Sequence, residues 1–386
     1  ADGQRYVTAS CLPAARGWFY LAVMSDFKFT PLVQSLPATV PFVGPETQER
    51  DRGAAFSARL GANESVFGPS PRAVEAMRAA TAEIWQYADP TCHDLREALA
   101  AHYNVPSASV LVGEGIDGIL GNLVRLLIAQ GDAVVTSNGA YPTFNYHVAG
   151  FGGALHKVDY AGDHEDLGAL LSRAREVGAK LIYVANPDNP MGSWHRGRDI
   201  EAALDDMPEG ALLVLDEAYV ELGPEEAAPK IAPDDPRVLR LRTFSKAYGM
   251  AGARIGYGIG APDLIKAFDK IRNHFGVNRV AQAGAVAALE DRAWLAHVQQ
   301  EVATSRARLE RIAADNGLTA LPSATNFVTM DCGLDGAFAR AVLTALLDQG
   351  VFVRMPFVAP QDRCIRVGCG RPGDMDLVAE TLPVAL

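Results

Sequence analysis

The stretch VLRLRTFSKAYGMAGARIGYG, residues 238–258, joins two short apolar runs through a polar turn. The runs at 238–242 and 253–258 have the branched and leucine-rich composition of buried strands. The turn opens with TFSK, so Lys246 stands just beyond a strand end among hydroxyl residues. Open α/β sheets bind their ligands beyond the carboxyl ends of the strands. This lysine, which taken alone would be a solvated surface residue, is therefore a candidate for chemistry.

The same pattern of short apolar runs recurs along the chain before this stretch. Segments with helical spacing, such as 116–130 and 167–177, separate most of the runs. The further expected strands are 109–112, 133–136, 154–158, 180–184 and 211–215. Strands that alternate with helices predict an α/β fold, with a mostly parallel seven-stranded sheet covered on both faces.

The pattern changes after about residue 276. Two long helices rich in Ala, Glu and Arg are expected, followed by a strand, a helix and two short strands; their ranges are 278–292, 294–315, 326–330, 337–348, 351–354 and 363–367. This order predicts a smaller α+β domain at the C-terminus. The predicted organisation is a dispensable extension, an N-terminal arm with part of the small domain, a large α/β domain and the C-terminal small domain, at 1–23, 24–75, 76–276 and 277–386.

Charge and composition exclude several classes of protein. The 386 residues include 35 basic and 46 acidic ones, a net charge of −11, so the chain repels nucleic-acid backbones and no nucleic-acid partner is expected. No apolar run approaches the roughly 18–20 residues of a membrane helix, so no membrane partner is expected either. The 5 cysteines are odd in number and form no CxxC, which excludes a disulfide framework and a zinc site and favours a cytoplasmic location.

Five consecutive strand ends carry chemically complementary groups. They are GEGIDG at 113–118, YPTF at 141–144, NPDNPMG at 186–192, DEAY at 216–219 and TFSK at 243–246. The lysine could form a Schiff base with a carbonyl group, and the carboxylate on the neighbouring strand could keep a pyridinium nitrogen protonated. A glycine-rich turn at a helix N-terminus offers backbone amides to a phosphate. Together these groups predict a site for pyridoxal 5′-phosphate.

The turn at 113–118 also fits the Gly-x-Gly-x-x-Gly fingerprint of dinucleotide-binding proteins. An NAD-dependent dehydrogenase is therefore an alternative of a different class. That fingerprint also requires an acidic residue about 20 positions further on, at the end of the next strand. This chain has Ser137 and Asn138 there, and nicotinamide chemistry gives no role to Lys246 or Asp216, so we favour a phosphate-binding turn.

Taken together, the motifs resemble the fold-type I aminotransferases of class I and II, most closely the histidinol-phosphate aminotransferases. The resemblance runs from about Leu60 to the C-terminus. Its motifs are Asn63-Glu64, GPSP at 68–71, YADP at 87–90, NPDNPMG at 186–192, DEAY at 216–219, TFSKAYGMAGARIG at 243–256 and CIRVG at 364–368. The resemblance implies the fold of the type I pyridoxal phosphate-dependent transferases.

The resemblance also implies roles for individual residues. Lys246 would carry the cofactor and move a proton between the substrate Cα and the cofactor C4′, while Asp216 would pair with the pyridinium nitrogen. Tyr219 and Asn189 would hydrogen-bond the phenolic oxygen of the cofactor, and Phe144 would stack on its ring. The phosphate would be held by Gly115, Ile116, Asp117, Thr243, Ser245 and Arg254, and by Tyr87 of the partner subunit.

Substrate contacts are implied in the same way. Arg366 would clamp an α-carboxylate, Arg354 would contact a distal substrate phosphate, and Asn63 would also face the substrate. The family implies a homodimer with shared active sites. It also implies ping-pong transfer of an amino group from an amino-acid-like donor, with histidinol phosphate leading, to 2-oxoglutarate. An aromatic amino acid aminotransferase, and a pyridoxal phosphate-dependent decarboxylase or lyase acting on a phosphorylated amino acid, are the alternatives within this chemistry.

Four positions depart from the pattern of the family. Ile116 stands where a small or hydroxyl residue is usual, Gly118 where an acid is usual, and Met191 where threonine is usual. His274 falls in a segment that tends to read Pro-Phe-Asn. These departures spare the expected catalytic residues and leave the substrate, rather than the cofactor, open.

Overall fold

The computed structural model describes residues 27–38 and 43–386 of the chain. The chain divides into two compact units, Ala1–Pro37 and Ala38–Leu386. In the described part of the first unit, helix α1 (Pro31–Ser35) is capped by Thr30, whose hydroxyl accepts a hydrogen bond from the Val33 amide. The extension expected at 1–23 lies outside the described residues.

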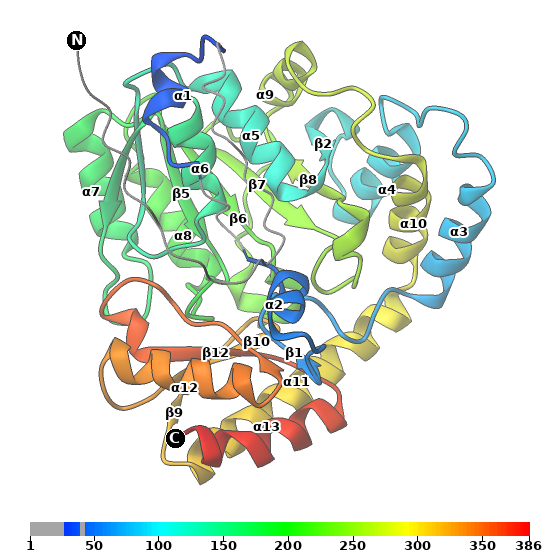
Figure 1. Ribbon diagram of the computed structural model, residues 1–386. Coiled ribbons are helices and arrows are strands. Elements are labelled where there is room, and N and C mark those ends of the chain that lie inside the picture. The colour runs from blue at the N-terminus through cyan, green and yellow to red at the C-terminus, as the bar shows by residue number, and fades with distance from the viewer. Residues whose placement is uncertain (1–26, 39–42) are drawn as a thin grey trace, which may run out of the picture. The chain divides into compact units, whose positions relative to one another are not determined.

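A seven-stranded sheet forms the centre of the second unit (Figure 1). Its strands run in the order β2-β8-β7-β6-β5-β3-β4. Their bounds are Val110–Gly113 for β2, Ala133–Ser137 for β3, Ala154–Val158 for β4, Leu181–Ala185 for β5, Leu212–Asp216 for β6, Val238–Thr243 for β7 and Gly256–Ile259 for β8. Only β8 runs antiparallel to its neighbours, β2 and β7. The mostly parallel seven-stranded sheet predicted from the sequence is confirmed.

Strand β8 begins three residues later than expected. A short 3₁₀ turn at Ala251–Ala253 precedes it, and Arg254 has a left-handed backbone with φ of 54°. A residue with positive φ cannot continue an extended strand. The polar turn after β7 is therefore longer than the apolar pattern suggested, and it contains Arg254.

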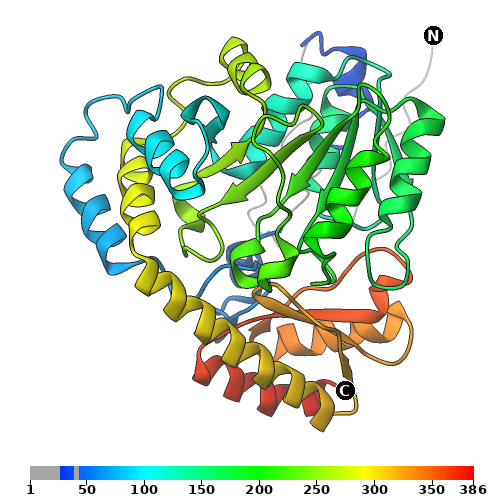
Figure 2. The same ribbon diagram turned by 180° about the vertical axis from the view of Figure 1, so that it is seen from behind.

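Helices cover both faces of the sheet (Figures 1 and 2). On one face, α5 (Gly115–Leu127) and α6 (Thr143–Gly150) pack against strand residues such as Tyr183 and Leu239. On the other face, α7 (Leu167–Val177) and α8 (Gly197–Asp205) pack against the alternate strand residues, among them Leu213. A strand buried on both faces has apolar residues at every position, which explains the continuous apolar runs in the sequence.

Three further helices pack together beside the β2–β8 edge. They are α3 (Pro71–Thr81), α4 (His93–Tyr103) and α10 (Arg279–Glu290). Helix α3 is capped by Ser70, whose hydroxyl accepts hydrogen bonds from the amides of Arg72 at 3.1 Å and Ala73 at 3.3 Å. The short helix α9 (Pro262–Ala267) follows β8.

The C-terminal part has its own small sheet with strand order β12-β10-β9, all pairs antiparallel. Its elements are α11 (Arg292–Asp315), β9 (Thr319–Ala320), β10 (Phe327–Asp331), α12 (Gly336–Asp348), β11 (Val351–Phe352), β12 (Cys364–Gly368) and α13 (Pro372–Ala385). Strand β1 (Ala58–Arg59) pairs with β11 in parallel, and α2 (Pro45–Arg52) precedes it. Across the described residues, every helix is too short or too polar to cross a membrane.

Candidate active site

Three loops that leave neighbouring strands are tied together at the carboxyl ends of β5, β6 and β7. The Asn186 amide donates to the Asp216 carbonyl oxygen at 2.8 Å, which joins the end of β5 to the end of β6. The Glu217 amide donates to the Leu241 carbonyl oxygen at 2.8 Å, which joins β6 to β7. Parallel strands end at the same edge of a sheet, so the residues that follow them share one site, as the sequence predicted.

Asp216 is the last residue of β6, and its carboxylate is buried. One carboxylate oxygen accepts a hydrogen bond from the Tyr183 hydroxyl at 2.7 Å, and the other accepts one from the Ala218 amide at 3.0 Å. Burial raises the pKa of Asp216 to about 6, while these two hydrogen bonds and the charge of Lys246 oppose the rise. The carboxylate is therefore ionised at neutral pH and can pair with a protonated ring nitrogen.

Lys246 lies beyond β7 with its ammonium group facing the same site. Its Nζ donates to the Asn63 carbonyl oxygen at 3.1 Å and lies 5.5 Å from the centre of the Tyr219 ring. Burial lowers the pKa of this lysine to about 8, and the positive charge of Arg366 contributes to the same shift. A lysine with a depressed pKa has a larger neutral fraction at physiological pH, which is the form that attacks a carbonyl.

Tyr219 and Asn63 contact each other beside this lysine. The Asn63 side-chain amide donates to the Tyr219 hydroxyl at 3.0 Å, and burial raises the pKa of Tyr219 well above its usual value. The side-chain oxygen of Asn63 is buried without a hydrogen-bond partner among the described residues. Both side chains therefore retain polar capacity for a bound group, because a buried polar atom without a partner is unfavourable.

Arg366 reaches the site from β12 of the small sheet. Its guanidinium donates to the side-chain oxygen of Asn189 and to the Gly61 carbonyl oxygen at 3.1 Å, and its Nε is buried without a partner. Burial lowers the pKa of Arg366 to about 10, and no carboxylate of the described residues forms an ion pair with it. A largely buried guanidinium with an unused donor indicates an anion-binding position.

Arg354 lies next to Arg366, because the two residues exchange backbone hydrogen bonds of 3.2 and 2.7 Å. The Arg354 guanidinium donates to the Val43 carbonyl oxygen and lies 5.2 Å from the centre of the Phe352 ring. Burial lowers the pKa of Arg354. Two neighbouring guanidinium groups without carboxylate partners in the described chain favour a substrate that carries more than one negative charge.

A third group of residues forms a cradle at the N-terminus of α5. The helix begins at Gly115, whose φ of 75° suits glycine, and no side chain caps its first amides. A Cβ atom at Gly115 would lie 2.7 Å from a guanidinium nitrogen of Arg254, so the two are in close contact. Gly256 of β8 allows a similar approach, because a Cβ there would lie 2.9 Å from the Ile116 amide nitrogen.

Two hydroxyl groups complete this cradle. The Thr243 hydroxyl donates to the Ser245 hydroxyl at 2.9 Å, and Arg254 donates to the Ser245 hydroxyl at 3.4 Å. Free amides at a helix N-terminus, two hydroxyls and a guanidinium are the donors that phosphate binds. The donor set therefore fits the phosphate of pyridoxal 5′-phosphate, and Asp216 and Lys246 fit its ring nitrogen and its aldehyde.

Three of the expected cofactor contacts, which stay predictions, have the following surroundings in the structure. Phe144 is completely buried, and its ring stacks on that of Tyr183, with centroids 4.8 Å apart and planes 15° apart. The Asp117 carboxylate contacts His147 at 2.7 Å, which leaves its backbone amide as the group available to a phosphate. Tyr87 is 80% exposed and its ring lies 4.8 Å from that of Phe275, so it contacts none of the residues described above.

Two tyrosines of this region had no predicted role, although Tyr141 opens the YPTF motif at 141–144. Tyr183 was counted as one residue of an apolar strand, although its hydroxyl contacts Asp216. Tyr141 is partly buried, and the charges of Asp117, Asp216 and Arg254 all influence its pKa, which burial raises. A phenol within an apolar run, or directly after a strand, was the available signal, because a buried hydroxyl requires a hydrogen-bond partner.

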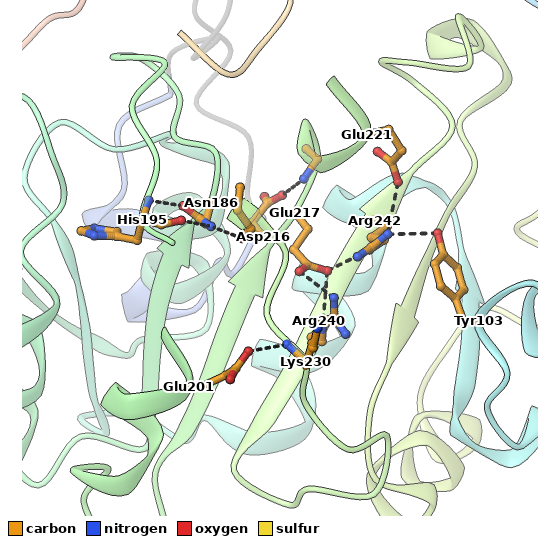
Figure 3. A network of polar contacts seen from close by, with 12 residues as sticks. Tyr103, Asn186, His195, Glu201, Asp216, Glu217, Glu221, Lys230, Arg240 and Arg242 are labelled. Carbon is orange, nitrogen blue, oxygen red and sulfur yellow. Dashed lines mark hydrogen bonds and ion pairs between the residues drawn. The ribbon is translucent and has the colours of Figure 1, made fainter. Parts of the chain in front are cut away.

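A buried ion network lies directly beside the site (Figure 3). Glu217 is fully buried and accepts hydrogen bonds from Arg240 at 2.9 and 3.1 Å and from Arg242 at 2.8 Å. Burial alone would raise the pKa of Glu217, but the two arginines hold it below its usual value. Arg242 also contacts Tyr103 at 3.1 Å and Glu221 at 3.5 Å. The network joins β6 to β7 immediately behind Asp216 and Thr243.

The fold and the groups of this site fit a phosphate-bearing carbonyl cofactor bound beside a lysine. A family model described as aminotransferase class I and II matches residues 58–382. The chain belongs to this family and is an enzyme that transfers amino groups. No group of three His, Cys, Asp or Glu residues that could hold a metal ion occurs in the part of the chain that the structure describes.

Within this family, the chain is similar to several histidinol-phosphate aminotransferases. The chain is 37% identical over 359 residues to a histidinol-phosphate aminotransferase of Anaeromyxobacter sp., covering 90% of this chain and 97% of the relative. It is 36% identical over 364 residues to that of Symbiobacterium thermophilum, covering 92% and 97%. Among solved structures, the histidinol-phosphate aminotransferase of Sinorhizobium meliloti in complex with pyridoxal-5′-phosphate is 54% identical with a TM-score of 0.91, covering 94% of this chain and 98% of that one.

Proposed function

We propose that this chain is a pyridoxal 5′-phosphate-dependent aminotransferase that moves an amino group from histidinol phosphate to 2-oxoglutarate. The assignment of the cofactor rests on one observation, that Lys246, Asp216 and the cradle at Gly115 and Arg254 lie at a shared edge of the sheet. The relatives support the substrate, since both are histidinol-phosphate aminotransferases over nearly their whole length. None of the comparisons favours a dehydrogenase or a decarboxylase.

Different residues of the chain have different roles in the proposed reaction. When bound, pyridoxal phosphate supplies an electron sink for the electron pair released at the substrate Cα. Asp216 maintains that sink by keeping a proton on the ring nitrogen, and Tyr219 and Asn189 donate to the phenolic oxygen. Lys246 holds the cofactor between turnovers, then accepts the Cα proton and returns it to C4′.

The two arginines provide for two different substrates in a ping-pong reaction. Histidinol phosphate carries a phosphate and no carboxylate, whereas glutamate carries two carboxylates. Arg366 binds the α-carboxylate of glutamate through its planar fork, and Arg354, beside it on the backbone, binds the distal phosphate of histidinol phosphate. This pair of cations favours anionic substrates over aromatic amino acids, whose side chains carry no second charge.

We also propose a homodimer in which each subunit completes the site of the other. Tyr87 is 80% exposed, and further exposed apolar side chains lie against it or near it in the sequence; they are Phe275 at 51%, Ile84 at 63% and Trp85 at 79% exposure. Such residues are unfavourable in water and are typical of an interface. Tyr87 contacts Phe275 instead of the cradle of its own chain, which fits a role at the phosphate of the partner subunit. A cytoplasmic location remains part of this proposal.

A panel of amine donors with 2-oxoglutarate as acceptor tests the substrate. Histidinol phosphate, phenylalanine and tyrosine are compared by kcat/KM, with glutamate formation as the measurement. We expect histidinol phosphate to exceed the aromatic amino acids by at least about 100-fold, since two neighbouring guanidinium groups without carboxylate partners in the described chain discriminate by charge. Equal values would indicate an aromatic amino acid aminotransferase, and CO2 release without an acceptor would indicate a decarboxylase.

A further inference from the structure

Tyr183 occupies a position from which a core tyrosine can act on the site. It lies in the middle of β5 and is completely buried. Ala185 of β5 pairs with Asp216 of β6, and Tyr183 stands two residues before Ala185. Side chains two positions apart on a strand point to the same face, so Tyr183 is a diagonal neighbour of Asp216.

The Tyr183 hydroxyl has one hydrogen bond in the described structure, to the Asp216 carboxylate at 2.7 Å. A phenylalanine would fill the same apolar space, so packing alone does not account for the hydroxyl. Burying a phenol is favourable only when its hydroxyl has a partner. The contact is charge-assisted, since Asp216 is the acceptor, and such hydrogen bonds are stronger than neutral ones.

Phe144 fixes the direction in which this hydroxyl points. The two rings are nearly parallel, with centroids 4.8 Å apart, and neither ring is exposed to solvent. Phe144 belongs to α6 and Tyr183 to β5, so the stacking contact locks a strand side chain against a covering helix. A buried ring held on its face cannot change rotamer without displacing its neighbour.

We propose that Tyr183 is a positioning residue for the cofactor, because its hydroxyl orients the Asp216 carboxylate toward the ring nitrogen, with Phe144 holding Tyr183 in place. The Ala218 amide holds the second carboxylate oxygen, so the plane of the carboxylate is fixed from both sides. Each oxygen keeps a further lone pair for the ring N–H. This inference rests on the proposed role of Asp216 and assigns Phe144 to the support of Tyr183.

The charge balance at Asp216 supports the same role. Burial pushes the Asp216 pKa up to about 6, and the Tyr183 hydrogen bond opposes that rise. Loss of the hydroxyl therefore raises the pKa of the carboxylate further toward neutrality. A less ionised Asp216 stabilises a ring N–H⁺ less well, which weakens the hold on the cofactor.

The variant Tyr183→Phe tests the proposal, with Tyr257→Phe as its matched control. Tyr257 is also a fully buried tyrosine of the same sheet, but its hydroxyl contacts the neutral Tyr103 hydroxyl at 2.6 Å. Three kinds of quantity are measured. The dissociation constant of pyridoxal phosphate is obtained from the absorbance of the lysine-bound cofactor, the pKa of that absorbance band is obtained by titration, and kcat and KM are obtained from steady-state kinetics. We expect about 10-fold weaker cofactor binding, a shifted band pKa and a lower kcat with unchanged KM in Tyr183→Phe.

Combining Tyr183→Phe with Asp216→Asn separates positioning from general stability. If Tyr183 acts through the carboxylate, its loss has less than about a 2-fold effect on cofactor binding once the carboxylate is gone. An unchanged Tyr183→Phe enzyme, an equal effect in Tyr257→Phe, or effects that simply multiply in the double variant would overturn the proposal. Wild-type cofactor binding and turnover in Asp216→Asn alone would instead refute the proposed role of Asp216.

Phe144→Leu provides a second route that leaves the hydroxyl in the chain. We expect about 3-fold weaker cofactor binding, with the band pKa shifted in the same direction as in Tyr183→Phe. In the Tyr183→Phe background this effect disappears if Phe144 acts through Tyr183. An undiminished effect in that background would show that Phe144 contacts the cofactor ring directly, and would contradict the supporting role inferred here.

Discussion

Asp216 and Glu217 are consecutive carboxylates with opposite surroundings. Asp216 has hydrogen bonds from a phenol and an amide, and burial raises its pKa to about 6. Glu217 lies on the other face of the strand end, where Arg240 and Arg242 hold its pKa below the usual value. One carboxylate has no cationic side chain hydrogen-bonded to it, while the other is fully paired. The difference indicates that the first binds a ligand and the second holds two strands together.

Among changes at the face that carries Asp216, replacement of Lys246 by alanine should have the largest effect on turnover. Without the amine, no covalent bond to the cofactor can form and no base lies at Cα. After incubation with pyridoxal phosphate and borohydride, mass spectrometry should find the cofactor attached to the wild type and absent from Lys246→Ala, and turnover should be abolished. Retained turnover would refute the assignment of this lysine.

Asp216→Asn and Glu217→Gln sharpen the comparison directly. Asp216→Asn should lower kcat by at least about 100-fold with a small change in stability, because a buried charge partner of the ring nitrogen is lost. Glu217→Gln should lower the free energy of unfolding by about 3–5 kcal/mol, because it leaves two arginines without their shared carboxylate. Denaturant titration and steady-state kinetics measure the two quantities, and a reversed pattern would contradict the division of roles.

The ion pairs of Glu217 with Arg240 and Arg242 also predict that the stability of the protein depends on pH. Its folded-state pKa is lowered, so its contribution is present above the unfolded value of about 4.5 and is lost as the pH falls through the folded value. Glu217→Gln should therefore be less stable than the wild type at pH 7, and the difference should shrink as the pH falls below 4.5 through the lowered folded-state pKa. Denaturant titrations across this pH range test it, and a constant difference between the two proteins would exclude the ion pair as the cause.

Arg354→Ala tests the substrate side of the site and should have a smaller effect. We expect KM for histidinol phosphate to rise by about 10- to 100-fold, as expected when a charged contact is removed, while kcat/KM for phenylalanine or tyrosine changes little. Arg363→Ala is a suitable control, because that arginine pairs with Asp163 and Asp331 instead. Equal losses for phosphorylated and aromatic donors would argue against a distal-phosphate contact.

The pH dependence of cofactor capture, measured on the wild type without any substitution, tests the two pKa shifts of the site. Burial lowers the pKa of Lys246 to about 8 and raises that of Asp216 to about 6. Capture requires a neutral amine and an ionised carboxylate, so its rate should rise from about pH 6 through pH 8 and level off only above about pH 9. Stopped-flow absorbance on cofactor-free protein measures the rate, and a profile that falls across this interval would contradict both shifts.

Much of the large sheet could be predicted from the sequence because its strands are buried on both faces. Each of the seven expected runs is a strand within three residues of its predicted bounds, and helix α7 has the predicted bounds of 167–177. The positions of Lys246 and Asp216 followed from the rule that the carboxyl ends of parallel strands share one edge, whereas Arg254 was implied only by the resemblance to the family. The division of the chain at 276 and the individual site roles stay predictions.

Contacts made across long stretches of chain could not be read from local patterns. Strand β1 has only two residues and pairs with β11 nearly 300 residues later, so periodicity carried no signal for it. The pairing of Glu217 with two arginines depends on the register of β6 against β7. The stacking of Phe144 on Tyr183 depends on how α6 packs over the sheet, which also could not be derived from motif spacing.

The cradle at the start of α5 has a consequence for enzyme behaviour in acid and base. Its donors are backbone amides beginning at Gly115, two hydroxyls and the guanidinium of Arg254. All of these groups can donate hydrogen bonds, and none of them is a carboxylate, so the cradle favours a bound group with high negative charge. A phosphate monoester loses its second proton at about pH 6 in water, so we expect these donors to lower that pKa and to keep the bound phosphate dianionic in mildly acidic solution.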